Sequence, residues 1–237
     1  MDSGERQLVA AMPLHAITST YGEDGLRARF AAEVATWPEP DQERLNRALD
    51  LAGRLHAGDR REREPYVNHL LRVAIRIMSH YSVRDADVAC AGLLHDAVED
   101  HAQELAGGDR DAALAVLAAE FGPRVAGLVG AVTNPVWVPG RDQHEQYREH
   151  VAQSLRGNPW ARVIKASDFT DNGVGLIHST GPRLRRLAGK YAPLVPVLRE
   201  LIARPDTPLD AAVRTRILTQ LDQAAERFAA LLAPEGS

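Results

Sequence analysis

Cysteine, aromatic residues and long apolar runs are all scarce in this sequence of 237 residues. The single cysteine, Cys90, rules out an internal disulfide and a metal cluster held by thiolates, and its setting in "VACAGLL" favours a buried thiol. Aromatic residues make up only 5% of the chain, whereas Ala, Leu and Arg recur throughout, which favours helices over sheets. No apolar run approaches the roughly 20 residues that a membrane-spanning helix needs. These scarcities indicate a helical protein without disulfides or membrane spans.

The charge balance excludes further classes of partner. The formal net charge is −4 at pH 7, while proteins that bind nucleic acid usually present a basic surface. The first residues, "MDSGERQLVAAMPLHAITST", lack the basic segment and apolar core of a signal peptide. We therefore expect a cytoplasmic protein with no nucleic-acid partner and no membrane partner, and the sequence leaves oligomerisation open.

Apolar residues recur at helical spacing along most of the chain. In "PDQERLNRALDLAGRLHAG", Leu45, Ala48 and Ala52 fall on one face, with acidic residues early and a glycine after the end. Similar patterns predict helices over 65–81, 84–100, 111–122, 123–133, 142–157, 160–171, 182–203 and 209–232. No alternating strand pattern of useful length occurs, and "ARVIKAS" is a short strand at most. The sequence predicts an all-α fold, a single domain of roughly ten helices.

The stretch "AGLLHDAVED" carries four ionisable side chains in an otherwise apolar helix. On one continuous helix, His95 lies above Glu99 and Asp96 lies above Asp100, because residues four apart share a face. Imidazole with carboxylate is a ligand set suited to Mn²⁺, Fe²⁺ or Zn²⁺, and a metal would satisfy several charges that are costly to bury. Read alone, such a motif more often marks a solvent-facing polar stripe than a metal site.

Two other polar residues interrupt apolar segments elsewhere in the chain. His69 follows the start of the helix in "EPYVNHLLRVA", and Asp168 lies in "VIKASDFTDN". Either alone fits a hydrogen-bonded core residue or a capping residue. Together with His95 and Asp96 they form an ordered set, H…HD…D, contributed by three separate helices.

Four motifs carry a resemblance to a known family, from about residue 56 to about residue 172: "HAGDRREREPYVNH", "LLHDAVED", "FGPRVAGLVGAVT" and "VIKASDFTDN". The chain resembles the HD superfamily of metal-dependent phosphohydrolases, and more narrowly the hydrolase domain of RelA/SpoT-type enzymes and their stand-alone small relatives. The resemblance implies an HD-domain helical bundle over about 40–205. An N-terminal extension (1–39) and a C-terminal helix (about 206–233) would pack on that core.

The resemblance also implies roles for individual residues. It implies one divalent ion, Mn²⁺ in the family with Fe²⁺ or Zn²⁺ as alternatives, held by His69, His95, Asp96 and Asp168. The attacking water would be positioned and deprotonated by Glu99 and Asp100. A small anionic nucleotide would be contacted by Arg60, Arg61, Tyr66, Lys165 and Asn172.

The chain departs from the family pattern beside the expected pocket. The Arg-rich loop is one residue shorter than usual, so Arg60, Arg61 and Arg63 compete for the family's basic pair. Further departures are Asp59 for a Gln, Leu70 for a Pro, and Phe169 and Asp171 for a basic residue and a His. These changes concern the identity of the nucleotide rather than the metal.

The activity that the resemblance implies is removal of the 3′-pyrophosphate from the alarmone ppGpp or pppGpp, the signal of the stringent response, giving GDP or GTP and pyrophosphate. One alternative keeps the metal and changes the substrate to another nucleotide or phosphomonoester, such as the 2′-phosphate of NADPH. A second alternative is a non-catalytic, metal-binding regulatory module. A water-activating pair such as Glu99 and Asp100 argues against this second alternative, because a structural site has no use for it.

Overall fold

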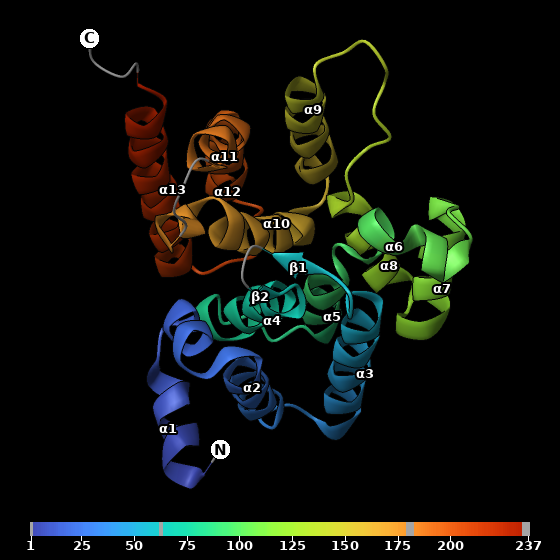
Figure 1. Ribbon diagram of the computed structural model, residues 1–237. Helices are drawn as coiled ribbons and strands as arrows, with labels where there is room; N and C mark the ends of the chain where they lie inside the picture. Colours follow the sequence, from blue (N-terminus) through green and yellow to red (C-terminus); the bar gives the residue numbers. More distant parts are fainter. Residues whose placement is uncertain (1, 62–63, 179–182, 234–237) are drawn as a thin grey trace. The chain divides into compact units, whose positions relative to one another are not determined.

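The computed structural model describes residues 2–61, 64–178 and 183–233 and is almost entirely helical (Figure 1). The all-α prediction is confirmed, and one two-stranded hairpin adds to it in the described part of the chain. The chain forms two compact units, an N-terminal unit over Met1–Thr133 and a C-terminal unit over Asn134–Ser237. The prediction of one domain with its core over 40–205 stays a prediction. None of the described helices is both long enough and apolar enough to cross a membrane.

The N-terminal unit is a cluster of helices around the buried helices α4 and α5. Its elements are α1 (Ser3–Ala11), α2 (Leu14–Val34), α3 (Glu39–Leu55), β1 (Arg60–Arg61), β2 (Glu64–Pro65), α4 (Val67–Ile75), the π-helix η1 (Arg76–His80), α5 (Ala86–Leu94), α6 (Ala97–Ala106), α7 (Arg110–Phe121) and α8 (Pro123–Val132). Every residue of α4 is buried, because α2 and α5 both pack against it, and α3 and α8 pack on α5. Of the candidate ligands, His69 lies on α4 and His95 directly follows α5.

Local capping signals explain where several of these helices begin and end. The Asp85 carboxylate accepts hydrogen bonds from two backbone amides at the start of α5, and Asp109 does the same for α7. Gly122 ends α7 at a φ of 97°, which a glycine adopts without steric cost, and Pro123 opens α8. The helix pair predicted on either side of this Gly–Pro is therefore confirmed.

The predicted continuous helix over 84–100 is wrong at its centre. The α5 helix ends at Leu94 and α6 begins at Ala97, so the pair His95–Asp96 lies at a junction. At this junction the His95 ring bonds back to a carbonyl of α5, and the Asp96 carboxylate accepts a hydrogen bond from Tyr66. These side-chain contacts hold the two residues at the break, and the single-helix stacking of His95 over Glu99 does not apply.

The C-terminal unit is built around α10. Its elements are α9 (Gln143–Arg156), α10 (Pro159–Asn172), the 3-10 helix η2 (Val174–His178), α11 (Arg183–Tyr191), the 3-10 helix η3 (Ala192–Leu194), α12 (Val195–Ala203) and α13 (Ala211–Leu232). Residues 161–171 of α10 are all buried, since α9 and α12 pack against it, and α13 packs on α12. The short strand considered for "ARVIKAS" is instead part of α10.

The long helix predicted over 182–203 is also wrong as one element. It consists of α11, the short η3 turn and α12. Pro193 lies in η3 and Pro196 in the first turn of α12, and neither can donate a backbone hydrogen bond to a continuous helix.

Candidate metal centre

Two buried imidazoles and one carboxylate converge in the N-terminal unit. His69 lies in the first turn of α4 and His95 directly follows α5; they are 0% and 2% exposed. Their Nε2 atoms are 3.3 Å apart. The Asp96 Oδ2 atom lies 3.0 Å from Nε2 of His95 and 3.7 Å from Nε2 of His69. Two imidazole nitrogens and a carboxylate oxygen at this spacing are a donor set that fits a divalent cation.

A hydrogen bond fixes which nitrogen of His95 can bind a metal. The Nδ1 atom of His95 lies 2.9 Å from the carbonyl oxygen of Gly92, and a carbonyl only accepts, so Nδ1 carries the proton. In the neutral ring the lone pair then resides on Nε2, as in metal-binding histidines whose other nitrogen donates to a carbonyl. Gly92 also keeps α5 close to its neighbour, because a Cβ there would lie 2.7 Å from Cδ1 of Ile77.

Tyr66 joins the centre to its surroundings. Its hydroxyl donates a hydrogen bond to Oδ2 of Asp96 at 2.7 Å, and burial raises the pKa of this phenol, with the Asp96 charge adding to the effect. The phenol ring stacks on the ring of His56 at 4.6 Å, and the guanidinium of Arg61 lies 5.4 Å from the Tyr66 ring centroid. Arg60 is exposed on β1 beside Arg61, whereas Arg63 lies outside the described residues.

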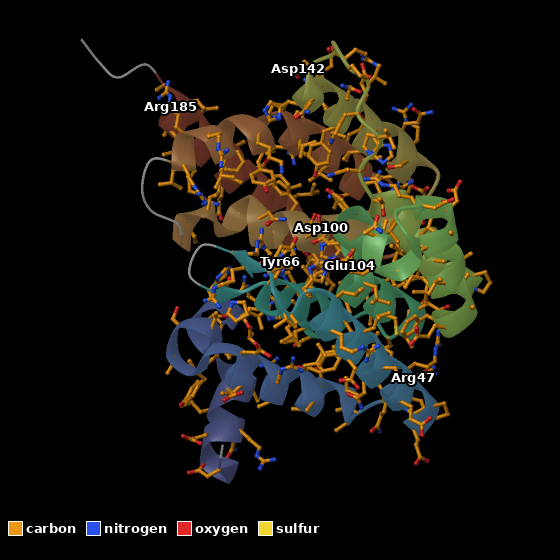
Figure 2. The ribbon with its side chains drawn as sticks, turned by 45° about the vertical axis from the view of Figure 1, so that its right-hand side comes forward. Arg47, Tyr66, Asp100, Glu104, Asp142 and Arg185 are labelled. Atoms are coloured by element: carbon orange, nitrogen blue, oxygen red, sulfur yellow. The ribbon has the colours of Figure 1, made fainter. Side chains whose placement is uncertain are left out.

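The predicted water-activating pair lies in the first turn of α6. Glu99 is half-buried, whereas Asp100 is exposed when its whole surface, backbone included, is counted. Asp100, Tyr66 and Glu104 are labelled in Figure 2. Desolvation of its carboxyl group raises the pKa of Asp100 to about 6, and the negative charges of Asp96 and Glu99 act in the same direction. A carboxylate of this pKa is a stronger base than an ordinary aspartate.

The remaining predicted residues form a cluster of their own in the C-terminal unit. The Asp168 carboxylate accepts hydrogen bonds from Lys165 Nζ at 2.9 Å and from Nδ2 of Asn172, all three residues lying on α10. Lys165 is buried, which opposes its charge, but Asp168 and Tyr147 outweigh this and raise its pKa well above the ordinary value. Lys165 also lies 5.4 Å from the centroid of the Tyr147 ring, a contact that the sequence did not predict.

The sequence did not predict a second histidine cluster. His56, Asp59 and His101 bring their ligand atoms together within the N-terminal unit. The signal in the sequence was weak, because His56 follows the end of α3 and His101 directly follows the motif "VED" without any spacing typical of metal ligands.

The chain is similar in sequence to known proteins. The model of the HD domain family matches residues 48–156. A human relative named guanosine-3′,5′-bis(diphosphate) 3′-pyrophosphohydrolase MESH1 is 36% identical over 128 residues, which are 52% of this chain and 64% of that protein. The Drosophila melanogaster protein of the same name is 30% identical over 142 residues, covering 59% of this chain and 71% of its own. The guanosine-3′,5′-bis(diphosphate) 3′-pyrophosphohydrolase of Aquifex aeolicus is 29% identical over 182 residues, covering 74% of this chain and 24% of its own.

A solved structure is similar as well. It is described as "A metazoan ortholog of SpoT hydrolyzes ppGpp and plays a role in starvation responses". It matches with a TM-score of 0.60 and 26% sequence identity, covering 81% of this chain and 97% of that one. The match to the human relative spans somewhat under two thirds of that protein's length, whereas the match to the Drosophila relative spans more. This chain belongs to the HD-domain family, in the group that contains the MESH1 proteins.

Proposed function

We propose that this chain is a metal-dependent phosphohydrolase that removes the 3′-pyrophosphate from ppGpp or pppGpp, giving GDP or GTP and pyrophosphate. The observation that carries the proposal is the convergence of His69, His95 and Asp96, with the lone pair of His95 placed on Nε2 by the bond from Nδ1 to a carbonyl. The names of the relatives support the choice of substrate. In this proposal the enzyme acts on a small anionic nucleotide in the cytoplasm.

We propose that one divalent ion, Mn²⁺ rather than Fe²⁺ or Zn²⁺, is held by His69, His95, Asp96 and Asp168. The donor set of the N-terminal unit supports the first three, and the family resemblance adds Asp168. Imidazole and carboxylate donors without a thiolate suit a metal of this class. When bound, such an ion lowers the pKa of a coordinated water and shields charge on the phosphoryl oxygens. The hydrogen bond from Tyr66 to Asp96 would hold that carboxylate in its ligand orientation.

The water-activating role falls to Asp100, with Glu99 beside it. The water oxygen bonds to the phosphorus next to the 3′ oxygen, and the bond from that phosphorus to the 3′ oxygen breaks. Asp100 takes a proton from the water as it attacks, and the 3′ oxygen leaves as the ribose hydroxyl after gaining a proton. The raised pKa of Asp100 supports this role, because a base works best when its pKa is near the working pH.

The cationic side chains would bind the pyrophosphate. Arg60 and Arg61 lie on the short hairpin that precedes Tyr66, and arginine forms planar contacts with phosphate through several donors. In the proposal Tyr66 packs near the base, and Lys165 and Asn172 contact the nucleotide from α10.

A second substrate class rests on one specific observation. Phe169 and Asp171, which depart from the family pattern, are both buried beside Asp168 in the sequence of α10. A buried phenyl ring and a buried carboxylate change the volume and charge of that segment. These substitutions favour the alternative substrate, which is another nucleotide or a phosphomonoester such as the 2′-phosphate of NADPH.

The decisive experiment is hydrolysis by the full chain with Mn²⁺ against ppGpp, pppGpp, NADPH and common nucleotides, with pyrophosphate and phosphate measured separately. We expect pyrophosphate from the alarmones alone, and its loss in His95→Ala and Glu99→Ala. His144→Ala and Glu120→Ala are matched controls, since both residues are exposed and lie outside the proposed site. Phosphate release from another nucleotide would instead assign the enzyme to the alternative substrate class, another nucleotide or a phosphomonoester. Bound Mn²⁺ without turnover on any substrate would refute an enzymatic function and leave a regulatory metal-binding module.

A further inference from the structure

Three side chains of the N-terminal unit form a cluster that the proposed hydrolysis does not use. They are His56, Asp59 and His101. Oδ2 of Asp59 lies 2.8 Å from Nδ1 of His56 and 2.8 Å from Nε2 of His101. The two imidazole nitrogens are 3.1 Å apart, so the three ligand atoms form a nearly equilateral triangle.

Two segments supply these atoms: the turn that follows α3 carries His56 and Asp59, and α6 carries His101. His56 follows the last residue of α3, and its carbonyl accepts a hydrogen bond from the amide of Asp59 at 3.1 Å. The carbonyl of Asp59 in turn accepts from the amide of Tyr66 at 3.1 Å, across the hairpin. His101 lies inside α6, but its φ of −128° and ψ of 26° depart from the helix. The kink in α6 therefore occurs at the residue that joins the cluster.

The dimensions of the triangle suit a small divalent ion. Zn²⁺ binds imidazole nitrogen and carboxylate oxygen at about 2.0–2.1 Å, so neighbouring ligand atoms in a tetrahedral site lie about 3.3 Å apart. The observed separations of 2.8–3.1 Å are a few tenths of an ångström shorter, a difference that small side-chain rotations remove. Three protein ligands would leave the fourth position to water.

The surroundings resemble those of a built metal site. Oε1 of Glu104 lies 3.3 Å from Nδ1 of His101, which is an ion-pair distance that places a carboxylate beside this imidazole. His56 is 2% exposed, and its Nδ1 atom faces the Asp59 carboxylate. The Asp59 side chain is 39% exposed and gives an ion a route from solvent.

We infer that His56, Asp59 and His101 form a second divalent-metal site, of the Zn²⁺ class. It is distinct from the centre at His69 and His95 and does not depend on the proposed hydrolysis. A bound ion ties the end of α3, the residue before β1 and helix α6 together. It thereby fixes the base of the hairpin that carries Arg60 and Arg61.

The test measures metal content in the background of His69→Gln, which disables the other centre. The full-length chain is stripped with a chelator, dialysed against buffered Zn²⁺ and analysed by mass spectrometry for zinc per chain. His69→Gln should retain about one zinc, and adding His101→Gln or Asp59→Asn should remove it. Equal zinc in His69→Gln and in both double variants would overturn the site and leave only a hydrogen-bonded trio.

Two further measurements guard against variants that fail to fold. Zn²⁺ should raise the midpoint of thermal unfolding of His69→Gln but not that of the double variants, whose circular dichroism should stay helical. Co²⁺ should give the visible absorption of a tetrahedral site in His69→Gln, and this absorption should vanish in His69→Gln with Asp59→Asn. His144→Gln and Asp50→Asn are the matched controls, because both residues are exposed, and they should leave the zinc content unchanged. Cobalt absorption that persists in the Asp59→Asn double variant refutes the site.

Discussion

Arg162 anchors the helix that carries Asp168, and its replacement by Met is a direct test of the C-terminal unit. The side chain is 0% exposed. Its Nε donates to the carbonyl of Leu155 at 2.8 Å, and Nη2 donates to the carbonyl of Arg156 at 2.5 Å. Nη1 donates to Oδ1 of Asp206 at 2.7 Å and to Oγ1 of Thr207 at 3.2 Å. Met fills a similar volume but supplies none of these donors.

The expected loss follows from the acceptors that Met leaves behind. Each buried acceptor that loses its donor costs about 1–3 kcal/mol. The carbonyl of Leu155 is buried and that of Arg156 is partly buried, whereas the Asp206 carboxylate is 44% exposed, so water can replace Arg162 there. From the two carbonyls we expect Arg162→Met to lower the free energy of unfolding by about 2–4 kcal/mol. For a chain of this size the midpoint of thermal unfolding should fall by about 4–16 °C.

Urea unfolding followed by circular dichroism measures this loss, with Arg199→Met as the matched control. Arg199 pairs with Asp222 at 3.4 Å in the same unit, but both side chains are about half exposed. A surface pair of this kind contributes about 0–1 kcal/mol. If Arg162→Met lowers the free energy of unfolding as little as Arg199→Met does, the acceptors bonded to Arg162 do not contribute to stability as we argue.

The same pair predicts a dependence of stability on pH. Hydrogen bonds from Arg162 and Arg204 hold the pKa of Asp206 well below its usual range. The ionised pair therefore stabilises the fold above the unfolded pKa of about 3.9, and this stability is lost as pH falls through the lower folded pKa. Unfolding measured below about pH 4 should depend less steeply on pH in Arg162→Met than in the wild type, and an unchanged slope would contradict this assignment.

Three further substitutions test the candidate metal centre. Tyr66→Phe keeps the ring but removes the hydroxyl that donates to Asp96. Calorimetry should therefore show an Mn²⁺ affinity about 10–100-fold lower. An unchanged affinity would show that the hydroxyl does not orient Asp96. Asp100→Asn should slow hydrolysis by about 10²–10⁴-fold without weakening Mn²⁺ binding, and a near-normal rate would move the base elsewhere. Gly92→Ala should cost about 1–3 kcal/mol in urea unfolding because its Cβ meets the buried Ile77, and wild-type stability would mean that this packing relaxes freely.

Helix boundaries marked by a glycine or proline were predictable from the sequence, whereas a boundary marked by side-chain contacts was not. The Gly122–Pro123 break was predictable because a positive φ and a missing amide are local properties of those residues. The break at His95–Asp96 was missed because apolar spacing continues across it. What marks that break is contact with Gly92 and Tyr66, which apolar spacing does not register.

The candidate site likewise contains residues that were predictable from the sequence and residues that were not. His69, His95 and Asp96 were named from the order of polar residues and from the family resemblance, and these three lie together. The cluster of Asp59 and His101 was missed because 42 residues separate them and neither lies in a motif with ligand spacing. The assignment of Asp168 to the same ion stays a prediction.

Tyr66 touches both histidine clusters, with its hydroxyl on Asp96 and its ring on His56. A metal ion that binds at one cluster and moves the Tyr66 ring would change the free energy with which a second ion binds at the other cluster. Such coupling is reciprocal, so each ion would alter the affinity for the other by the same factor. The two clusters are then not independent binding sites, and a metal titration of the wild-type chain would show cooperativity that disappears when either cluster is disabled.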